Sequence, residues 1–164
     1  MNFISADNKF VVFSMSQWTS RKGFDKLIQA FSAEFGNSDD VVLILKTFGS
    51  ITHNDERIRQ EIKALRNSIL LSGNEKVTKN NILLIPGFIS NENISWLYEK
   101  TDLFGLLSRG EGFGLTIAEA LSQEVPVLVS KEGGHLDYIS EEAAFLVDGM
   151  WDTCTFSMPP YESD

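Results

Sequence analysis

Apolar runs alternate with amphipathic stretches along most of the chain. Six short runs are rich in apolar, β-branched and aromatic residues, which is typical of strands buried on both faces. They cover residues 9–15, 40–47, 81–87, 102–108, 125–130 and 143–149. The stretches between them carry apolar residues three and four positions apart, as one face of a helix does. This spacing predicts helices over 22–35, 53–72, 91–101 and 114–122, and a short helical turn over 133–140.

Strands that alternate with helices through short connections favour one fold class. We expect an α/β protein with a Rossmann-like, doubly wound parallel sheet of about six strands and helices on both faces, because right-handed crossovers place the helices there. Residues 1–150 are predicted to form this domain. Residues 151–164 show no clear period and include Pro159 and Pro160. We expect an irregular tail there, truncated from a longer protein.

Composition and charge indicate what kind of protein the chain is and which partners it disfavours. A chain of 164 residues that is 43% hydrophobic and 23% charged suits one soluble globular domain. Its net charge of −9 disfavours nucleic acid and anionic membranes as partners. No segment approaches the ~18 apolar residues of a membrane span, and the N-terminus lacks a signal-peptide pattern. The single cysteine, Cys154, cannot form an internal disulfide. We therefore expect a cytoplasmic location.

The segment SRGEGFGLTIAEAL at residues 108–121 is the strongest candidate for a site. Ligands of open parallel sheets bind beyond the carboxyl ends of the strands, near the point where strand order reverses. The fourth predicted strand, one candidate for that point, leads directly into this segment. Gly112 and Gly114 allow a tight turn, and Thr116 is a candidate N-cap of the next helix. The amides that open a helix attract phosphate.

Two carboxylates in this segment need an explanation. Glu119 lies too far into the predicted helix to cap it, but it is suited to accept both hydroxyls of a ribose. Glu111, on the loop, is suited to bind a second hydroxylated group across the phosphates. A diphosphate with a polyol at each end is a nucleotide sugar. The alternative is a glycine-rich turn with no ligand; neither the G-x-G-x-x-G fingerprint nor a Walker loop is present.

Other residues near the strand ends have two interpretations each. Trp18 either stacks on a ligand or, as we expect, packs beside a helix. His135 either approaches a phosphate or lies on the surface. Lys46 and Arg109 lie close enough to the carboxyl ends of their strands to approach the site.

The segment EGFGLTIAE resembles the E-x7-E motif of retaining glycosyltransferases with the GT-B fold, especially glycosyltransferase family 4. Three further segments resemble that family in the same order: WTSRKGFDKLIQAF, IPGFISNENISWLYEKTDLFGLLSRGEGFGL and VPVLVSKEGGHLDYI. The resemblance extends from about Phe10 to Gly149. It implies the C-terminal half of a GT-B enzyme, the domain that binds the nucleotide-sugar (NDP-sugar) donor.

The resemblance also implies an activity and partners. The enzyme would transfer a hexose from an NDP-sugar to an acceptor with retention of configuration, without a metal or other cofactor. An N-terminal GT-B domain, absent from this chain, would supply the acceptor site. We therefore expect the chain by itself to bind donor and to be inactive or nearly so. Two alternatives remain open: a non-catalytic GT-B-like interaction module, and a GT-B-fold epimerase.

Roles follow from the resemblance position by position. Glu111 and Lys22 would be catalytic, with Glu111 on the donor sugar and Lys22 neutralising the departing β-phosphate. Glu119 would bind the ribose, and Phe88 would flank the base. The remaining donor-binding positions are Ser108, Gly112, Phe113, Gly114, Leu115, Thr116, Gln17 and Arg21. Three positions depart from the family pattern: Gln17 replaces an arginine, Glu124 a glycine, and Asp137 a longer carboxylate.

Overall fold

The structure, a computed structural model, describes residues 8–48, 54–69, 77–140 and 142–149. The strands are β1 (Phe10–Gln17), β2 (Val41–Phe48), β3 (Ile82–Pro86), β4 (Leu103–Leu106), β5 (Val127–Ser130) and β6 (Ala144–Val147). The helices are α1 (Phe24–Phe35), α2 (Asp55–Asn67), α3 (Asn91–Glu99) and α4 (Leu115–Ser122), with short 3₁₀ turns at Ser20–Lys22 and Gly134–Asp137. The predicted alternation of strands and helices is confirmed. The predicted tail at 151–164, with Cys154, lies outside the described residues.

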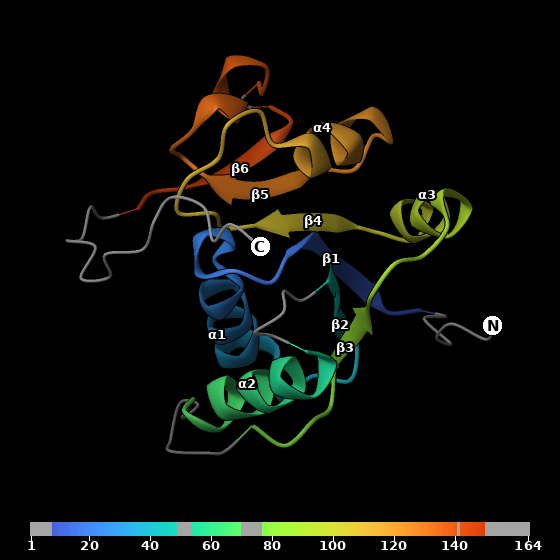
Figure 1. The fold of residues 1–164 in the computed structure, drawn as a ribbon, viewed down its shortest axis with the longest axis vertical. Coiled ribbons are helices and arrows are strands. Elements are labelled where there is room, and N and C mark those ends of the chain that lie inside the picture. The colour runs from blue at the N-terminus through green and yellow to red at the C-terminus, as the bar shows by residue number, and fades with distance from the viewer. Residues whose placement is uncertain (1–7, 49–53, 70–76, 141, 150–164) are drawn as a thin grey trace.

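All six strands run parallel, in the order β3-β2-β1-β4-β5-β6. The chain adds strands outward from β1 to β3, then crosses back through α3 to place β4 on the other side of β1 (Figure 1). Strand order therefore reverses between β1 and β4. This confirms the doubly wound, Rossmann-like sheet, and it places the fourth strand at the reversal.

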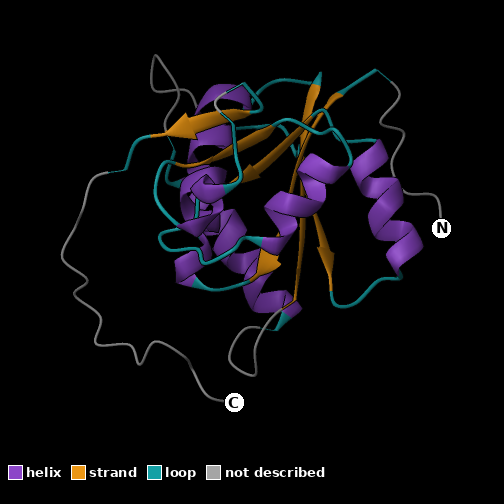
Figure 2. Cartoon of the chain, turned by 90° about the horizontal axis from the view of Figure 1, so that it is seen from above, coloured by secondary structure: helices purple, strands orange, loops and turns teal. Residues whose placement is uncertain are grey.

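Side chains alternate between two cores because successive residues of a strand face opposite sides of the sheet. Along β1, Val11 and Phe13 pack with α3 and α4, whereas Val12 packs with α1 and α2. Figures 1 and 2 show the helices on both sides of the strands. The ring of Phe13 is fully buried and meets Phe104 of β4 edge-to-face at 5.8 Å between centroids. Two packed layers thus hold β1 and β4 rigidly at the centre of the sheet.

Helix α2 is shorter than the helix predicted over residues 53–72. It begins after Asn54, whose side chain accepts a hydrogen bond from the amide of Arg57 at 3.0 Å, and it ends at Asn67. The apolar spacing continues to Ile69, but the amide of Ile69 bonds Arg66 in a turn. Asn and Ser side chains compete with helical backbone bonds, so Asn67 and Ser68 end the helix. Residues 53 and 70–72 lie outside the described residues.

The turn after α4 explains one departure from the family pattern. Glu124 has a φ of 61°, in the left-handed region, where a side chain clashes with the backbone and glycine is favoured. Glu124 is exposed, so packing does not demand its side chain. The family's usual glycine at this position therefore has a backbone reason, and the glutamate strains the turn.

We predict that Glu124→Gly raises the free energy of unfolding by about 1 kcal/mol, since it removes the left-handed strain. Urea unfolding followed by circular dichroism measures the change. Gln123→Gly is the matched control: its φ of −97° needs no glycine, so the added chain entropy should lower stability. Equal effects of the two substitutions would contradict the strain at Glu124.

Candidate functional site

The loops that follow β1 and β4 meet at the carboxyl edge of the sheet. The amide of Arg109 donates to the carbonyl oxygen of Arg21 at 2.7 Å, which joins the two loops. Gly23 has a φ of 65°, and a Cβ built there would overlap the carbonyl oxygen of Leu107. Only glycine therefore permits this approach, which fixes the preceding residue, Lys22, beside the β4 loop.

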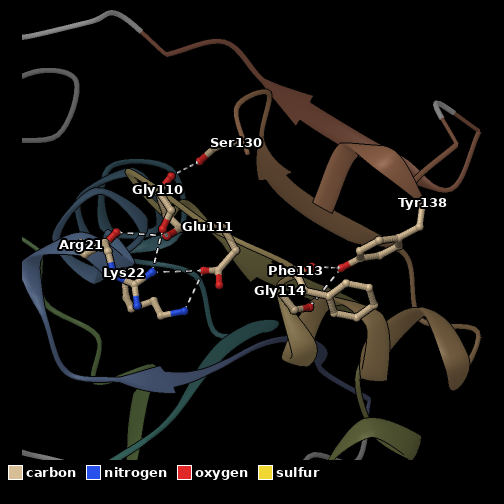
Figure 3. A network of polar contacts seen from close by, with 9 residues as sticks. Arg21, Lys22, Gly110, Glu111, Phe113, Gly114, Ser130 and Tyr138 are labelled. Carbon is tan, nitrogen blue, oxygen red and sulfur yellow. Dashed lines mark hydrogen bonds and ion pairs between the residues drawn. The ribbon is translucent and has the colours of Figure 1, made fainter. Parts of the chain in front are cut away.

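Lys22 and Glu111 form the central ion pair of this edge. The Lys22 Nζ lies 2.7 Å from the Glu111 Oε2, and the two side chains are only 13% and 9% exposed. Arg21 adds a weaker contact of 3.8 Å to the same oxygen and donates to the carbonyl oxygen of Gly110 at 2.7 Å. Figure 3 shows the three side chains converging from the two loops. The structure thus brings together the two residues predicted to be catalytic.

Ser108 stabilises the start of the loop from within. Its side chain lies 2.9 Å from the carbonyl oxygen of Gly110 and 3.1 Å from that of Arg21. The hydroxyl of Ser130, at the end of β5, donates to the Ser108 carbonyl at 2.7 Å. Ser108 is 3% exposed. Ser108 therefore lies beside the candidate site, and its hydroxyl contacts the backbone of both loops.

The start of α4 differs from the expected one in its cap. The helix begins at Leu115, and its N-cap is Gly114 with a left-handed φ of 75°, so the predicted N-cap role of Thr116 is wrong. Thr116 is the second helical residue because the glycine takes the conformation that ends the loop. No side chain of the described residues caps this end. The amides of Leu115 and Thr116 have no acceptor within the helix, and they attract negative charge.

A close approach of Gly134 to Gly112 brings the loop after β5 against this segment. The amide of Gly134 donates to the carbonyl oxygen of Glu111 at 3.0 Å, and a Cβ on Gly134 would lie 2.6 Å from the carbonyl oxygen of Gly112. The Tyr138 hydroxyl is 2.7 Å from the carbonyl oxygen of Phe113 and 3.0 Å from that of Gly114 (Figure 3). Burial raises the pKa of the Tyr138 phenol, and the charge of Glu111 raises it further, so Tyr138 remains a donor. The loop is therefore held from both sides.

Glu119 projects from α4 toward solvent but is held at one oxygen. The Tyr98 hydroxyl of α3 lies 3.2 Å from the Glu119 Oε2 and 3.2 Å from the carbonyl oxygen of Thr116. Burial raises the pKa of Tyr98 well above its usual range, and the Glu119 carboxylate adds to the shift. The phenol thus stays protonated and donates to the carboxylate.

Exposed aromatic rings flank the same edge. Phe88 follows β3 and is 90% exposed, and its ring stacks on Phe48 of β2 with centroids 5.6 Å apart. Phe113 and Leu115 are also exposed on the β4 loop and the start of α4. Gln17 ends β1 and is half-buried. The predicted donor-binding positions therefore share one edge, but they extend from the β3 loop to α4.

Several expectations for the neighbouring residues are resolved. Trp18 is buried, stacks on Phe24 and donates to Glu61 at 2.7 Å, so it packs as expected. His135 was expected on the surface or at a phosphate, but it is 1% exposed, and its Nε2 lies 2.8 Å from the carbonyl oxygen of Ser130. The surface location is wrong because the ring is buried beside the end of β5.

The two basic residues placed near the strand ends are occupied by other contacts. Arg109 turns away from Glu111 and forms a two-pronged ion pair with Asp25 of α1, at 2.9 and 2.6 Å. Lys46 is buried, bonds the carbonyl oxygen of Gly87, and has a pKa lowered by burial. Both residues therefore orient loops of the edge.

Sequence reasoning missed Tyr98, Tyr138 and Asp25 because each acts through another residue of the site. All three lie within the segments that resemble the family, and no feature of the sequence distinguishes them from their neighbours. Their partners are 21, 25 and 84 positions away in sequence, too far for local spacing to indicate them.

Two further findings concern the described residues alone. Within 8–48, 54–69, 77–140 and 142–149, no three His, Cys, Asp or Glu side chains are grouped so as to hold a metal ion. In the same part of the chain, every helix is too short or too polar to cross a membrane.

The fold and this edge define a class: a Rossmann-like α/β domain with an uncapped helix start and basic residues where strand order reverses. The chain belongs to the family described as glycosyl transferases group 1, which matches residues 2–153.

The chain is similar to several curated glycosyltransferases. It is 29% identical over 130 residues to mannosylfructose-phosphate synthase of Agrobacterium fabrum. The aligned region covers 79% of this chain and 27% of that enzyme. It is 32% identical over 124 residues to alpha-galactosylglucosyldiacylglycerol synthase of Streptococcus pneumoniae. Here the aligned region covers 76% of this chain and 29% of that enzyme. The chain thus spans less than a third of the length of either relative.

Solved structures match the fold. The UDP-forming trehalose-phosphate synthase of Burkholderia xenovorans superposes with a TM-score of 0.69 at 15% identity, covering 87% of this chain and 34% of that one. The C-terminal domain of a glycosyl transferase group 1 family protein of Francisella tularensis gives a TM-score of 0.63 at 25% identity, covering 85% and 67%. The predicted GT-B-type architecture is thereby confirmed for this domain.

The Asp25–Arg109 pair predicts a pH dependence of stability. Burial by itself would raise the pKa of Asp25, but the hydrogen bonds and charge of Arg109 outweigh it, and the pKa is lowered. The pair therefore stabilises the fold above the unfolded-state pKa of about 3.9, and this contribution is lost as the pH falls below that value. Since Asp25 is partly exposed, the contribution is below about 1 kcal/mol.

Urea unfolding at several pH values tests this prediction. Asp25→Asn should lower the unfolding free energy at pH 7 and have no effect at pH 2. In an Arg109→Ala background the pH-dependent effect of the same substitution should be smaller, because the contribution of Arg109 is gone and only that of Lys26 remains to lower the pKa of Asp25. A loss that is equal at pH 7 and pH 2 would show that the ion pair contributes nothing to stability.

Proposed function

We propose that this chain is the nucleotide-sugar-binding domain of a retaining glycosyltransferase of the family 4 type. The observation that carries the proposal is the uncapped start of α4, which follows Gly114, next to the side chain of Glu111 that pairs with Lys22, and which has Glu119 one turn further along the helix. Amides and an ammonium suit a diphosphate, and carboxylates suit the hydroxyls of the ribose and of the sugar. A nucleotide sugar has these groups in this order.

The donor would lie along the carboxyl edge. Its diphosphate would meet the amides of Leu115 and Thr116 at the start of α4. Its ribose would reach Glu119, and its base would approach the exposed ring of Phe88. The donor sugar would lie near Glu111 and the β4 loop. One solved neighbour of this fold, a trehalose-6-phosphate protein of E. coli, is bound with UDP-2-fluoro glucose, which supports a ligand of this class.

The reaction would use the charges of this edge. As the bond from the anomeric carbon to the β-phosphate oxygen lengthens, negative charge accumulates on the departing diphosphate. Oriented amides and Lys22 would stabilise that charge most where it is greatest, in the transition state. These groups supply the stabilisation without a metal ion. The acceptor would enter from a second domain of a longer enzyme, so this chain alone would bind donor but transfer little or no sugar.

Lys22 is paired with Glu111, and we propose that the diphosphate of the donor replaces this carboxylate. Glu111 keeps the ammonium folded onto the loop until the phosphate arrives. On exchange, Lys22 would turn to the phosphate, and Glu111 would be released to accept a hydroxyl of the donor sugar.

The proposed function predicts that the chain binds a nucleotide-sugar donor. Titration with UDP-, GDP- and ADP-sugars should shift the backbone amide resonances of residues 110–119 for at least one of the three. Glu119→Ala should weaken binding of that donor by at least ~1 kcal/mol, about fivefold, because ribose hydroxyls lose an ionised acceptor. Glu92→Ala on α3 is the control and should leave affinity unchanged. The absence of shifts with all three donors would refute the proposal.

Substitutions of Lys22 and Glu111 should change the affinity for the nucleoside diphosphate in opposite directions. Lys22→Met should weaken binding of the nucleoside diphosphate about tenfold, since a hydrogen bond to a charged group is lost. Glu111→Gln should strengthen it by a few-fold, since it releases Lys22 and removes a like charge. Calorimetry with UDP, GDP and ADP measures both effects, and the parent nucleosides serve as controls that neither variant should change. Weakened binding in Glu111→Gln would exclude the exchange.

A further inference from the structure

We infer that Tyr98 is a positioning residue: its hydroxyl fixes the Glu119 carboxylate in the orientation that receives the ribose. This inference rests on the proposed function. It adds to that function a residue on a different helix, outside the segment that carries the two carboxylates.

The Tyr98 ring is a rigid support. It is 3% exposed and packs edge-to-face on Phe13 at 5.3 Å and against Phe104 at 6.0 Å. Both partners are fully buried residues of the central strands β1 and β4. The hydroxyl at the end of this ring therefore has a position set by the core of the sheet, at the junction of α3 and α4.

Glu119 by itself has no such constraint. It is exposed on α4, and an exposed glutamate exchanges between rotamers, so ordering it has an entropic cost. The Tyr98 hydroxyl, 3.2 Å from the Oε2, is its one hydrogen-bond donor among the described residues. Holding one oxygen orients the carboxylate before a ligand arrives, so the ligand need not bear that ordering cost.

The geometry leaves room for the ribose. A carboxylate offers about four acceptor sites on its two oxygens, and the phenol occupies one of them. The Oε1, with the remaining site on Oε2, stays available for two vicinal hydroxyls. The same Tyr98 hydroxyl lies 3.2 Å from the Thr116 carbonyl oxygen, so its single proton is shared between that carbonyl, in the first turn of α4, and the Glu119 carboxylate.

Tyr98→Phe tests this role because it removes the hydroxyl and keeps the buried ring. Affinities for UDP, GDP and ADP are compared with those for their 2′,3′-dideoxy forms, which lack the hydroxyls that Glu119 would bind. For each diphosphate that binds, the substitution should weaken the ribose form about three- to tenfold and the dideoxy form less than twofold. Equal weakening of both forms would mean that Tyr98 acts only on the fold and would overturn the inference.

Two controls make the result specific. Tyr138→Phe removes the other phenol of this edge, which holds the carbonyls of the β4 loop, and it should weaken ribose and dideoxy forms alike. In a Glu119→Ala background, which leaves no side-chain acceptor at this position, Tyr98→Phe should cause no selective loss of the ribose form. A selective loss that persists there would exclude action through Glu119. Thermal unfolding of each variant confirms that it is folded.

A measurement without ligand separates this inference from the proposed function. Three-bond proton couplings report whether the Glu119 side chain holds one χ1 rotamer. We expect one rotamer in the wild type and averaged couplings in Tyr98→Phe. Averaged couplings in both proteins would overturn the positioning role. If none of the three diphosphates binds the wild type, the proposed function fails, and the couplings still decide whether Tyr98 orders Glu119.

Discussion

The approach of Gly23 to the carbonyl group of Leu107 is the constraint on which the carboxyl edge depends. Strand order reverses between β1 and β4, so the loops that follow these neighbouring strands must pass beside each other. A side chain at Gly23 would overlap the Leu107 carbonyl, and its positive φ further requires glycine. With that approach in place, the Arg109 amide reaches Arg21, and Lys22 reaches Glu111. The ion pair is thus a consequence of backbone packing at the reversal.

Gly134 and Gly112 make a similar close backbone approach on the other side of the β4 loop. Gly134 lies against the Gly112 carbonyl and donates to Glu111, so the β4 loop is enclosed between the β1 and β5 loops. Tyr138 then holds the carbonyl groups of Phe113 and Gly114. The order of the loop therefore comes from hydrogen bonds to its backbone carbonyl groups and from the Lys22–Glu111 ion pair. The amides of Leu115 and Thr116, which follow this loop and which the proposed diphosphate would use, therefore have set directions.

The sequence was sufficient to predict the fold and the position of the candidate segment in it, because both depend on local patterns. Continuous apolar runs identified all six strands, and the glycine-rich segment after the fourth strand lies at the reversal as predicted. The contacts that orient the site were not predictable. Whether Arg109 turns toward Glu111 or Asp25 depends on where α1 lies, and whether His135 is covered depends on the β5 loop. The cap of α4 was missed for a local reason: Thr is a common cap, but the left-handed Gly114 ends the loop one residue before the helix.

The two carboxylates of the edge are held by different kinds of partner, and this difference suits the roles proposed for them. The Glu111 side chain is 9% exposed and pairs with an ammonium group, so in the proposed exchange a more highly charged anion would compete for that partner and release the carboxylate. Glu119 is exposed and is held by a neutral phenol, which orders it without cancelling its charge. A carboxylate that keeps its charge is the stronger acceptor for two hydroxyls. An exchangeable group beside the proposed sugar and a fixed group beside the proposed ribose would let the nucleotide bind first in a set position, and the charge at the reacting end would rearrange only when the diphosphate is in place.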